Sequence, residues 1–379
     1  MKVGIIGNYG HNNNGDEAIL SGLLHQLTTA GHVQKENIVV FSNNPSNTKE
    51  RHGVASFPLL YKEGSVVKSG LKTIKESRKV MKQLDLLIIG GGGLLMDMYK
   101  RDAPLYSVLG LTGKFSGCRV AVHGVGAGPI TTKPGRFFIK KLLQASSSVA
   151  VRDEKSKQLL REIGVQKNVD VIYDPAFSVP VKEPRQRSDR IQKVGITAVP
   201  YFSQQYWPTP DPDKYEAYLT GMAASLDQLI PEKGIEVTFF STKYPEDVQV
   251  TKDIAAKMNQ QEHINIIEDN LPPEEIVNIA SSQDLVIGTR LHSLILSVNA
   301  ETPIIGVEYH KKVKDFMSEI KKDKYSVPID KLQDKENGIV QAFEKADTNW
   351  QQLQENTTDI SRNLKQKAAE GMKLLELKN

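Results

Sequence analysis

Short apolar runs rich in β-branched residues alternate with longer helical patterns along almost the whole chain. Such alternation leaves few folds open, because strand, helix and strand in succession pack most simply as a parallel sheet covered by helices. The predicted strands fall at residues 2–7, 36–42, 85–93, 118–126, 147–153 and 169–177, and then at 193–199, 235–241, 264–269, 284–290 and 302–309. We therefore predict an α/β protein with two open sheets.

A polar stretch from Val179 to Lys193 separates the two groups of strands. It contains prolines and has no apolar periodicity, which is typical of a linker. Pairs of Rossmann-like domains usually bind ligands in a cleft that faces the carboxyl ends of their strands. We thus expect two Rossmann-like open-sheet domains facing a cleft: an N-terminal domain over 1–180, a linker over 181–193, a second domain over 194–345 and a C-terminal helix over 346–379.

Composition limits the classes of partner and the compartment. A net charge of +4 over 379 residues is mildly basic, well below the concentrated charge of a dedicated nucleic-acid binder. The single cysteine, Cys118, excludes an internal disulfide and fits a reducing compartment. The chain opens MKVGIIG, directly on a strand, and has no apolar run long enough to span a membrane. We expect a cytoplasmic protein, and the sequence does not indicate a number of subunits.

Four loops that follow predicted strands carry residues suited to chemistry. The first runs from Asn8 to Glu17, where glycines permit tight turns and four asparagines offer amide hydrogen bonds, so Asn13 is a candidate substrate ligand. Asp16 is expected to cap the following helix or to act on an acceptor hydroxyl. Because Asp16 and Glu17 already place negative charge at that helix end, sugar hydroxyls suit this loop better than a phosphate does.

The second loop, GGGGLLMD from Gly90 to Asp97, contains four consecutive glycines. Ordering them costs backbone entropy, which favours a close approach of ligand or main chain at Gly91 and Gly92. The loop has neither the lysine of a P-loop nor the spacing of a dinucleotide fingerprint. It is therefore a candidate substrate contact without a nucleotide signature.

The third site combines HGVGAGP, from His123 to Pro129, with Arg152, which directly follows an apolar strand. An arginine at a strand end can bind a phosphate or carboxylate through two parallel hydrogen bonds. A salt bridge to Asp153 or Glu154 would explain Arg152 equally simply.

The fourth loop reads GTRLHS, from Gly288 to Ser293, and places Arg290 in a strand-to-helix turn. His292 falls in the first turn of the next helix. A lone histidine on a helix is usually structural, but a helix amino end is itself an anion site, and a bound anion would favour the imidazolium form. Arg290, His292 and Ser293 are therefore the central candidates for a site that binds an anion and donates a proton.

Five motifs together resemble the polysaccharide pyruvyl transferase family. They are GNYGHNNNGDEAIL, GGGGLLMD, HGVGAGP, VRDEKSKQLLREIGV with VIYDPAF, and DLVIGTRLHSLILSVNAETPIIGVEYHKKV, in this order between about residues 3 and 320. The resemblance implies a two-domain fold of the GT-B type, with acceptor on the N-terminal side and donor on the C-terminal side. It also implies transfer of the enolpyruvyl unit of phosphoenolpyruvate to a sugar of a cell-surface glycan, which forms a pyruvate ketal.

The resemblance assigns roles to individual residues. Arg152, Arg290 and His292 correspond to the residues that hold phosphoenolpyruvate, with His292 as the expected acid; Lys312 matches a lysine near the same anion, and Asp16 matches an acidic position in the opening loop. The chain departs from the family pattern in GITAVPYF, where many relatives carry an arginine and this sequence has Val199 and Pro200. The group that replaces that charge is left open.

Phosphoenolpyruvate is the expected co-substrate, with no other cofactor, and the scattered histidines predict no metal site. Aromatic residues between Pro200 and Pro210 could stack on a sugar or simply pack. A lipid-linked acceptor would bring the protein to the inner membrane face, where the basic stretch Lys62 to Lys82 and the residues around Phe137 and Phe138 could contact anionic lipid; a solvated helix face explains them too. The competing functions are a GT-B glycosyltransferase or sugar-nucleotide epimerase, and a glycan-binding protein without turnover.

Overall fold

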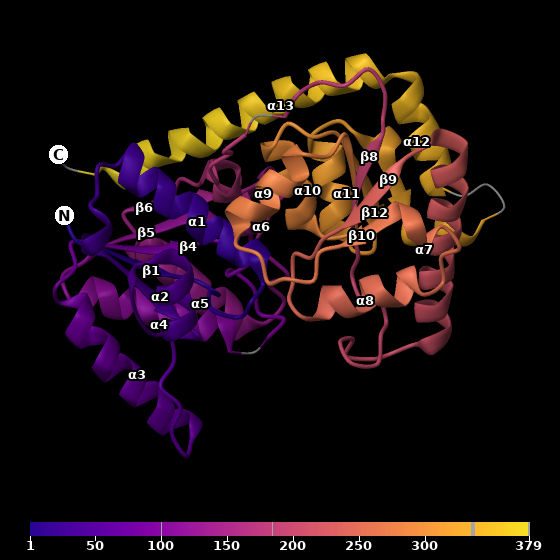
Figure 1. The fold of residues 1–379 in the computed structure, drawn as a ribbon. Coiled ribbons are helices and arrows are strands. Elements are labelled where there is room, and N and C mark those ends of the chain that lie inside the picture. The colour runs from indigo at the N-terminus through magenta and orange to yellow at the C-terminus, as the bar shows by residue number, and fades with distance from the viewer. Residues whose placement is uncertain (100, 184, 335–337, 378–379) are drawn as a thin grey trace. The chain divides into compact units, whose positions relative to one another are not determined.

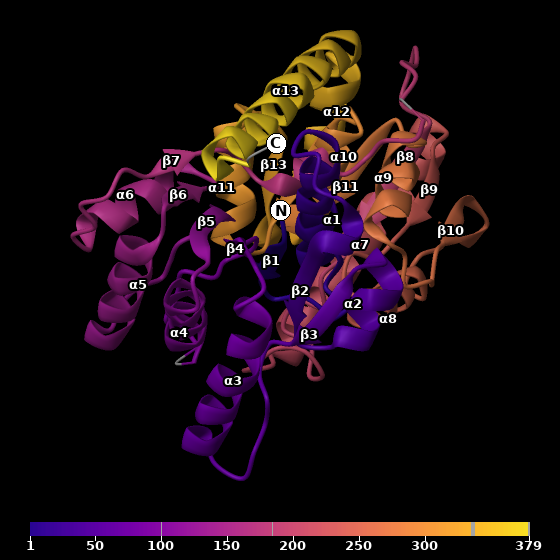
Figure 2. The ribbon, with the colours of Figure 1, turned by 90° about the vertical axis from the view of Figure 1, so that its left-hand side faces the viewer.

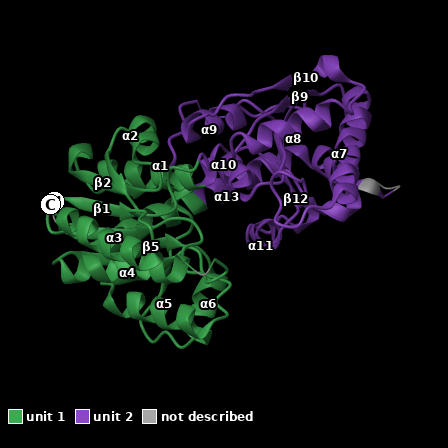
Figure 3. Ribbon diagram, turned by 90° about the horizontal axis from the view of Figure 1, so that it is seen from below, with its two compact units in different colours: residues 1–11, 16–178, 364–379 green, residues 12–15, 179–363 purple. Residues whose placement is uncertain are grey.

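The computed structural model describes residues 1–99, 101–183, 185–334 and 338–377. The chain forms two compact units, which Figure 3 distinguishes by colour. Unit 1 comprises Met1–His11, Asp16–Ser178 and Leu364–Asn379, and unit 2 comprises Asn12–Gly15 and Val179–Asn363. This division differs from the consecutive domains expected from the sequence, because residues 12–15 belong with the second unit and the end of the chain belongs with the first.

Unit 1 is built on a parallel sheet of seven strands in the order β3-β2-β1-β4-β5-β6-β7 (Figure 1). The strands are β1 (Val3–Ile6), β2 (Ile38–Ser42), β3 (Ala55–Pro58), β4 (Leu86–Gly90), β5 (Arg119–Val125), β6 (Ser148–Val151) and β7 (Asp170–Val171). The helices are α1 (Asn14–Thr29), α2 (Pro45–His52), α3 (Val66–Met81), α4 (Asp102–Phe115), α5 (Lys133–Ala145) and α6 (Glu154–Glu162).

The central strands of unit 1 are apolar on both faces, because helices cover the sheet on both sides. Along β4, Leu87 and Ile89 face a core shared with α4, α5 and α6, while Leu86 and Ile88 face a second core shared with α1. Met372 and Leu375 near the carboxyl end of the chain lie in this second core. Alternating side chains therefore enter opposite layers, which explains why the sequence shows continuous apolar runs.

Unit 2 contains a parallel sheet of six strands in the order β10-β9-β8-β11-β12-β13. The strands are β8 (Lys193–Thr197), β9 (Glu236–Phe239), β10 (Ile264–Ile266), β11 (Leu285–Gly288), β12 (Ile304–Glu308) and β13 (Ser326–Pro328). The helices are α7 (Pro212–Lys233), α8 (Glu246–Ala255), α9 (Pro273–Ser281), α10 (Leu291–Asn299), α11 (Lys311–Glu319), α12 (Gly338–Thr348) and α13 (Trp350–Glu370), of which α13 ends in unit 1.

Both sheets follow the same winding order, starting near the middle, proceeding to one edge, and then returning to the other side of the first strand. In sheets of this kind, ligands bind beyond the carboxyl ends of the two strands at which the direction of winding reverses. Those strands are β1 and β4 in unit 1, and β8 and β11 in unit 2. Four loops follow these strands. They are the asparagine loop (residues 8–17), the glycine loop (residues 90–97), the aromatic loop (residues 200–210) and GTRLHS (residues 288–293).

The α/β fold with two parallel sheets and a C-terminal helix is confirmed, with local differences. The strands β3 and β13 were not predicted, and β7 is shorter than predicted, since the chain turns at Tyr173 with a φ of 60°. The single C-terminal helix expected from about Ala346 is interrupted, because α12 ends at Thr348 and α13 begins at Trp350.

The predicted linker is anchored to unit 2 through Arg185. Its guanidinium donates hydrogen bonds to the carbonyl oxygens of Gln283 and Asp284 and to the side chain of Gln354 in α13. It also lies 5.5 Å from the ring centroid of Trp350. The polar composition of this stretch therefore reflects side chains bonded to the unit, which sequence patterns alone cannot distinguish from solvated ones.

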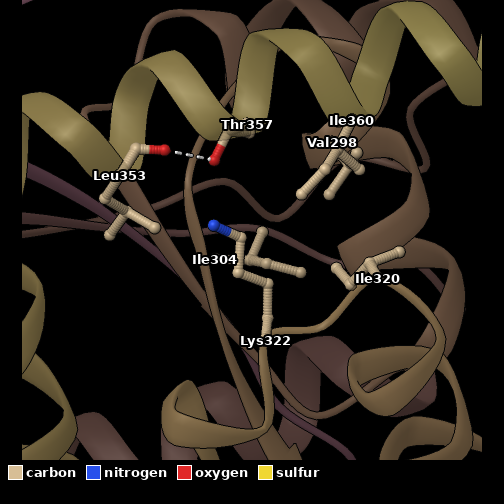
Figure 4. Close-up of a pocket in the computed structure, with 7 residues that line it drawn as sticks. All are labelled: Val298, Ile304, Ile320, Lys322, Leu353, Thr357 and Ile360. Atoms are coloured by element: carbon tan, nitrogen blue, oxygen red, sulfur yellow. Dashed lines mark hydrogen bonds between the residues drawn. The ribbon is translucent and has the colours of Figure 1, made fainter.

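An apolar pocket in unit 2 holds a buried lysine. Figure 4 shows Lys322 extending from the loop after α11 toward α13, past Ile304, with Leu353 and Thr357 opposite. Its side chain is 7% exposed. Burial, together with the nearby ammonium of Lys324, lowers the pKa of Lys322 to about 8. Charging this amine in the folded state is therefore costly.

We predict that Lys322→Met stabilises the protein at neutral pH. The pKa of Lys322 in the folded state lies below its ordinary value, so the unfolded chain holds the proton more tightly, and wild-type stability rises with pH through and above about pH 8. Allowing for partial screening by water, the gain at pH 7 is roughly 1–2 kcal/mol. Urea unfolding at several pH values measures it, with exposed Lys345→Met as control. A variant that is no more stable than wild type at pH 7 would contradict the prediction.

Candidate functional site

The asparagine segment of the opening loop packs within unit 2. The amide of Asn14 donates to the carbonyl oxygen of Thr242 at 2.9 Å, and Tyr244 donates to the carbonyl oxygen of Asn12 at 3.1 Å. Asn13 forms an antiparallel bridge with Lys243. The chain after β9 therefore holds the predicted ligand Asn13 in the same unit as β11 and α10.

Gly15 at the end of this segment lies against the ring of His292. A methyl group on Gly15 would come within 2.3 Å of Nδ1 and 2.7 Å of Cγ of His292. His292 lies in the first turn of α10, directly after the strand β11. Since only a glycine leaves room for the ring, residues 12–15 and the GTRLHS motif pack together around His292 within unit 2.

We predict that Gly15→Ala destabilises the protein by about 1–3 kcal/mol, because the added methyl group overlaps the imidazole and forces a shift of loop or ring. Chemical denaturation measures the change. Gly64→Ala is a matched control, since a Cβ at Gly64 meets no atom within 4 Å, and its effect is expected to stay within about 0.5 kcal/mol. Equal stability of the two variants would show that the contact with His292 is loose.

Arg290 precedes α10 and forms a buried ion pair with Asp247 in the first turn of α8. Its Nε donates to both carboxylate oxygens at 3.1 Å, and Nη2 donates to Oδ1 at 2.5 Å. The side chains are 12% and 1% exposed. Burial alone would lower the pKa of Arg290, but Asp247, with smaller contributions from Tyr309 and Tyr206, raises it well above its ordinary value. Arg290 is therefore a fixed positive charge.

Asp247 itself is also held by the chain after β9. Its carboxylate accepts hydrogen bonds from the backbone amides of Thr242 and Lys243 at 3.3 and 2.9 Å. Burial raises the pKa of Asp247 even though Arg290 and these two amides favour the charged carboxylate. Asp247 thus links the segment that binds Asn13 to the arginine of GTRLHS.

Tyr206, from the aromatic loop after β8, lies between two cations. Nη1 of Arg290 donates to its hydroxyl at 3.2 Å, and Nζ of Lys243 lies 4.3 Å from its ring centroid. Burial would raise the pKa of Tyr206, but Arg290 and Lys243 outweigh it, and the net shift is downward. The ring of Tyr206 therefore lies against two cationic side chains, each of which is also paired with an acidic residue: Arg290 with Asp247, and Lys243 with Glu246 at 3.3 Å.

Three more aromatic rings extend from Tyr206 toward α11. They belong to Trp207, Tyr309 and His310. The ring of Tyr309 lies 6.4 Å from that of Trp207 and 6.0 Å from that of His310. Nδ1 of His310 accepts a hydrogen bond from the amide of Lys312, which lies exposed in the first turn of α11. Because β12 adjoins β11 in the sheet, Lys312 follows a strand on the same edge as Arg290. Its predicted contact with an anion stays a prediction.

Ser293 makes structural hydrogen bonds at the start of α10. Its hydroxyl is fully buried, lies 2.7 Å from that of Thr197 at the end of β8, and donates to the carbonyl oxygen of Arg290 at 2.7 Å. These contacts join β8 to the start of α10 and orient Arg290. The predicted contact of Ser293 with substrate stays a prediction.

In unit 1, Asp16 lies over the glycine loop. A methyl group on Gly92 would come within 2.9 Å of its Oδ1, and Asn8 donates to its Oδ2 at 3.0 Å. The expectation that Asp16 caps α1 is wrong, because α1 begins two residues earlier and Asn13 accepts a hydrogen bond from the amide of Gly15. Asp16 is instead a nearly buried carboxylate at the edge where β1 and β4 end.

Gly91 and Gly92 have left-handed backbone conformations, with φ of 82° and 66°. A methyl group on Gly91 would lie 2.4 Å from a carbon of Ile19 and 2.9 Å from the hydroxyl of Tyr9, which donates to the carbonyl oxygen of Gly90 at 2.6 Å. The glycines are therefore required by the packing of this loop, and their contact with substrate stays a prediction.

Arg152 follows β6 and lies over Gly126 of HGVGAGP, where a methyl group would come within 2.9 Å of its Nε. It pairs with Asp153 at 3.4 Å and with Asp174 at 3.6 Å. The salt bridge to Asp153 that the sequence left open is thus present, with a second partner. Arg152 and its motif come together in unit 1.

Two residues of this site were missed by sequence reasoning. Lys243 and Asp247 lie in STKYPED, which follows β9 just as the four candidate loops follow their strands. An acidic residue in a first helical turn directly after a strand was the available signal. Within the described residues, no group of three or more His, Cys, Asp or Glu side chains is arranged to hold a metal ion.

The amino-acid sequence of the chain is similar to those of known proteins. The model of the polysaccharide pyruvyl transferase family matches residues 13–311. The amylovoran biosynthesis protein AmsJ of Erwinia amylovora is 21% identical over 396 residues, covering 91% of this chain and 93% of AmsJ. The family match begins at Asn13 and includes the GTRLHS motif.

Solved structures with low sequence identity share the fold. UDP-GlcNAc 2-epimerase from Methanocaldococcus jannaschii aligns with a TM-score of 0.60 at 13% identity, over 93% of this chain and 100% of that one. MurG from Acinetobacter baumannii aligns with a TM-score of 0.57 at 14% identity, over 98% and 99%. The fold is therefore GT-B-like.

Proposed function

Because this chain belongs to the polysaccharide pyruvyl transferase family, whose members are transferases of polysaccharide biosynthesis, we propose that it transfers the enolpyruvyl unit of phosphoenolpyruvate to a glycan and forms a pyruvate ketal. The observation that carries this proposal is the packing of unit 2 at the ends of β8 and β11. There a histidine in a first helical turn lies in one unit with two cations that surround Tyr206.

The charge of the site suits a small anion that carries both a phosphate and a carboxylate. Arg290 is a permanent cation, and Lys243 provides a second positive charge beside it. Most of the N–H groups of Arg290 already donate hydrogen bonds to Asp247 and Tyr206. We therefore assign Arg290 an electrostatic role, in which its positive charge attracts the anion without direct contact. We assign direct contacts with phosphoenolpyruvate to Lys243 and Lys312, and retain Arg152 as a proposed ligand from unit 1.

The proposed chemistry starts with His292 as a general acid. Its imidazolium donates a proton to the methylene carbon of phosphoenolpyruvate, which becomes a methyl group, and positive charge develops on the adjacent carbon that bears the phosphate ester. A glycan hydroxyl attacks this carbon and loses its proton. Inorganic phosphate then leaves, and a second hydroxyl of the same sugar attacks to close the ketal, losing its proton in turn. Asp16 is the proposed group that orients or deprotonates the acceptor.

Lys243 fills the position left open by Val199 and Pro200. Val199 is fully buried and carries no charge, whereas Lys243 lies in the loop after the neighbouring strand β9, against Tyr206. A charge-assisted contact contributes about 1.5–3 kcal/mol, so Lys243→Gln is expected to raise the KM for phosphoenolpyruvate about tenfold or more. Steady-state kinetics measure it, with exposed Lys252→Gln on α8 as control. An unchanged KM would remove Lys243 from the binding site.

The function itself is tested by mass spectrometry of candidate glycans incubated with the protein and phosphoenolpyruvate. A ketal on the glycan, with release of phosphate only when both substrates are present, supports the proposal. Stabilisation against heat by nucleotide sugars and not by phosphoenolpyruvate would instead indicate a glycosyltransferase or epimerase. Binding of glycan without phosphate release would indicate a glycan-binding protein.

A further inference from the structure

Helix α3 projects from unit 1 with an apolar end. Figures 1 and 2 show its amino end, and the loop before it, extending away from the sheet and from α4. Val66, Val67 and Leu71 in its first turns are 90%, 71% and 65% exposed. A Cβ on the nearby Gly70 meets no atom within 4 Å, so this end is surrounded by open space. The side chain of Ser65 caps the helix by accepting a hydrogen bond from the amide of Lys68.

The two faces of α3 differ sharply. Thr73, Ser77 and Met81 are buried against the rest of unit 1. The opposite face continues from the apolar end into basic residues at spacings of three or four, which place them in one row. This row consists of Val67, Leu71, Lys75, Arg78 and Lys82. The exposed surface of α3 is therefore apolar at its tip and positive along its length.

The charge of this segment is large for its length. Between Lys62 and Lys82 the sequence has seven basic and two acidic residues. Seven minus two gives a net charge of +5 for this segment, which exceeds the net charge of +4 of the whole chain. The two acidic residues are already paired, Glu63 with Lys72 and Glu76 with Lys79. The remaining five basic side chains leave an excess of positive charge around the apolar tip.

An anionic bilayer fits this surface better than a protein partner does. A stable protein interface buries about 800 Å² on each side and excludes charge from its centre. Here three apolar side chains stand on a narrow projection and are flanked by an excess of positive charge, since both nearby glutamates are paired. An interfacial helix combines apolar residues that enter the headgroup region with lysines and arginines that contact acidic lipid headgroups.

We propose that α3 docks unit 1 on a membrane surface rich in anionic lipid, with Val66, Val67 and Leu71 inserted and Lys68, Lys75, Arg78 and Lys82 against the headgroups. Neither signal is strong alone, so binding is peripheral and reversible. This proposal is independent of the reaction catalysed. Among the described residues, no helix is long and apolar enough to cross a membrane.

Co-sedimentation of the full chain with vesicles tests the proposal. Binding is expected to vesicles of phosphatidylcholine with about 30% phosphatidylglycerol, and at least tenfold less to phosphatidylcholine alone. Raising the salt from about 0.1 to about 0.5 M should weaken binding, because it shortens the Debye length. Val66→Ser/Val67→Ser/Leu71→Ser should lower the partition coefficient about tenfold or more, because it removes the apolar insertion.

Charge reversal provides the matched comparison. Lys68→Glu/Lys75→Glu/Lys82→Glu should weaken binding to anionic vesicles at least about 100-fold, since each basic residue near the surface contributes about fivefold and the new carboxylates repel the headgroups. Lys49→Glu/Lys345→Glu/Lys373→Glu changes the net charge equally at exposed positions outside α3, and should retain most of the binding. Equal losses in the two triple variants would overturn the proposal, as would binding that is indifferent to lipid charge. So would a wild-type chain that stays in the supernatant and forms dimers that the serine variant abolishes. Unchanged thermal unfolding of each variant excludes a folding defect.

Discussion

His292→Ala should lower the turnover number for phosphoenolpyruvate and glycan by about 10²–10⁴-fold, because general acid catalysis by a positioned side chain typically contributes that much. Binding of phosphoenolpyruvate should change little, since the cations of the site do not depend on the imidazole. Phosphate release under saturating substrate measures the turnover number, and calorimetry measures the binding.

The control for this variant is His25→Ala, which removes an exposed histidine from α1 in unit 1. His292 packs against Gly15, so thermal unfolding must be recorded for both variants to separate a loss of chemistry from a loss of stability. Near-normal turnover by a stable His292→Ala protein would exclude His292 as the acid and leave it as a packing residue.

Asp247→Ala should cost about 3–5 kcal/mol of unfolding free energy, because it leaves the buried guanidinium of Arg290 without its main partner. The backbone amides of Thr242 and Lys243 lose their acceptor at the same time. Urea denaturation measures the change. A loss below about 1 kcal/mol would mean that Arg290 is accessible to water or to another anion.

The double variant Asp247→Leu/Arg290→Met separates the contribution of this ion pair to stability from its contribution to binding of phosphoenolpyruvate. Replacing both charges by apolar side chains of similar size is often neutral or stabilising, so most of the lost stability should return. Binding of phosphoenolpyruvate should stay weakened, since Lys243 alone then supplies positive charge beside Tyr206. If binding survives in the double variant, Arg290 has no electrostatic part in the site.

The fold was largely predictable because its strands are buried on both faces. Eleven predicted strands correspond to strands in the two sheets, and the glycine-rich turns after them lie where expected. The missed strands, β3 and β13, lie at sheet edges, are short, and end in Pro58 and Pro328. An edge strand needs little apolar periodicity, so its pattern is weak.

The site was predictable only in part, for a different reason. The residues of GTRLHS could be placed at a strand-to-helix turn from local pattern, and the structure puts them there. The partner of Arg290 lies 43 residues away in the sequence, and nothing in either segment indicates the pairing. Lys243 and Asp247 lie near Arg290 because β9 pairs with β8, so the loop after β9 ends at the same edge of the sheet. The pairing of distant loops depends on this order, which local pattern does not specify.

The carboxyl end of the chain has a consequence for synthesis on the ribosome. Met372 and Leu375 belong to the core of unit 1, whose sheet is complete by Ser178. At a synthesis rate of about 5–20 residues per second, the nascent unit 1 therefore waits roughly 10–40 s for its last core residues. During that interval Met372 and Leu375 are not yet present to cover the apolar residues of α1 and β5 with which they share a core. The last residues of unit 2 are thus synthesised before the last residues of the unit that begins the chain.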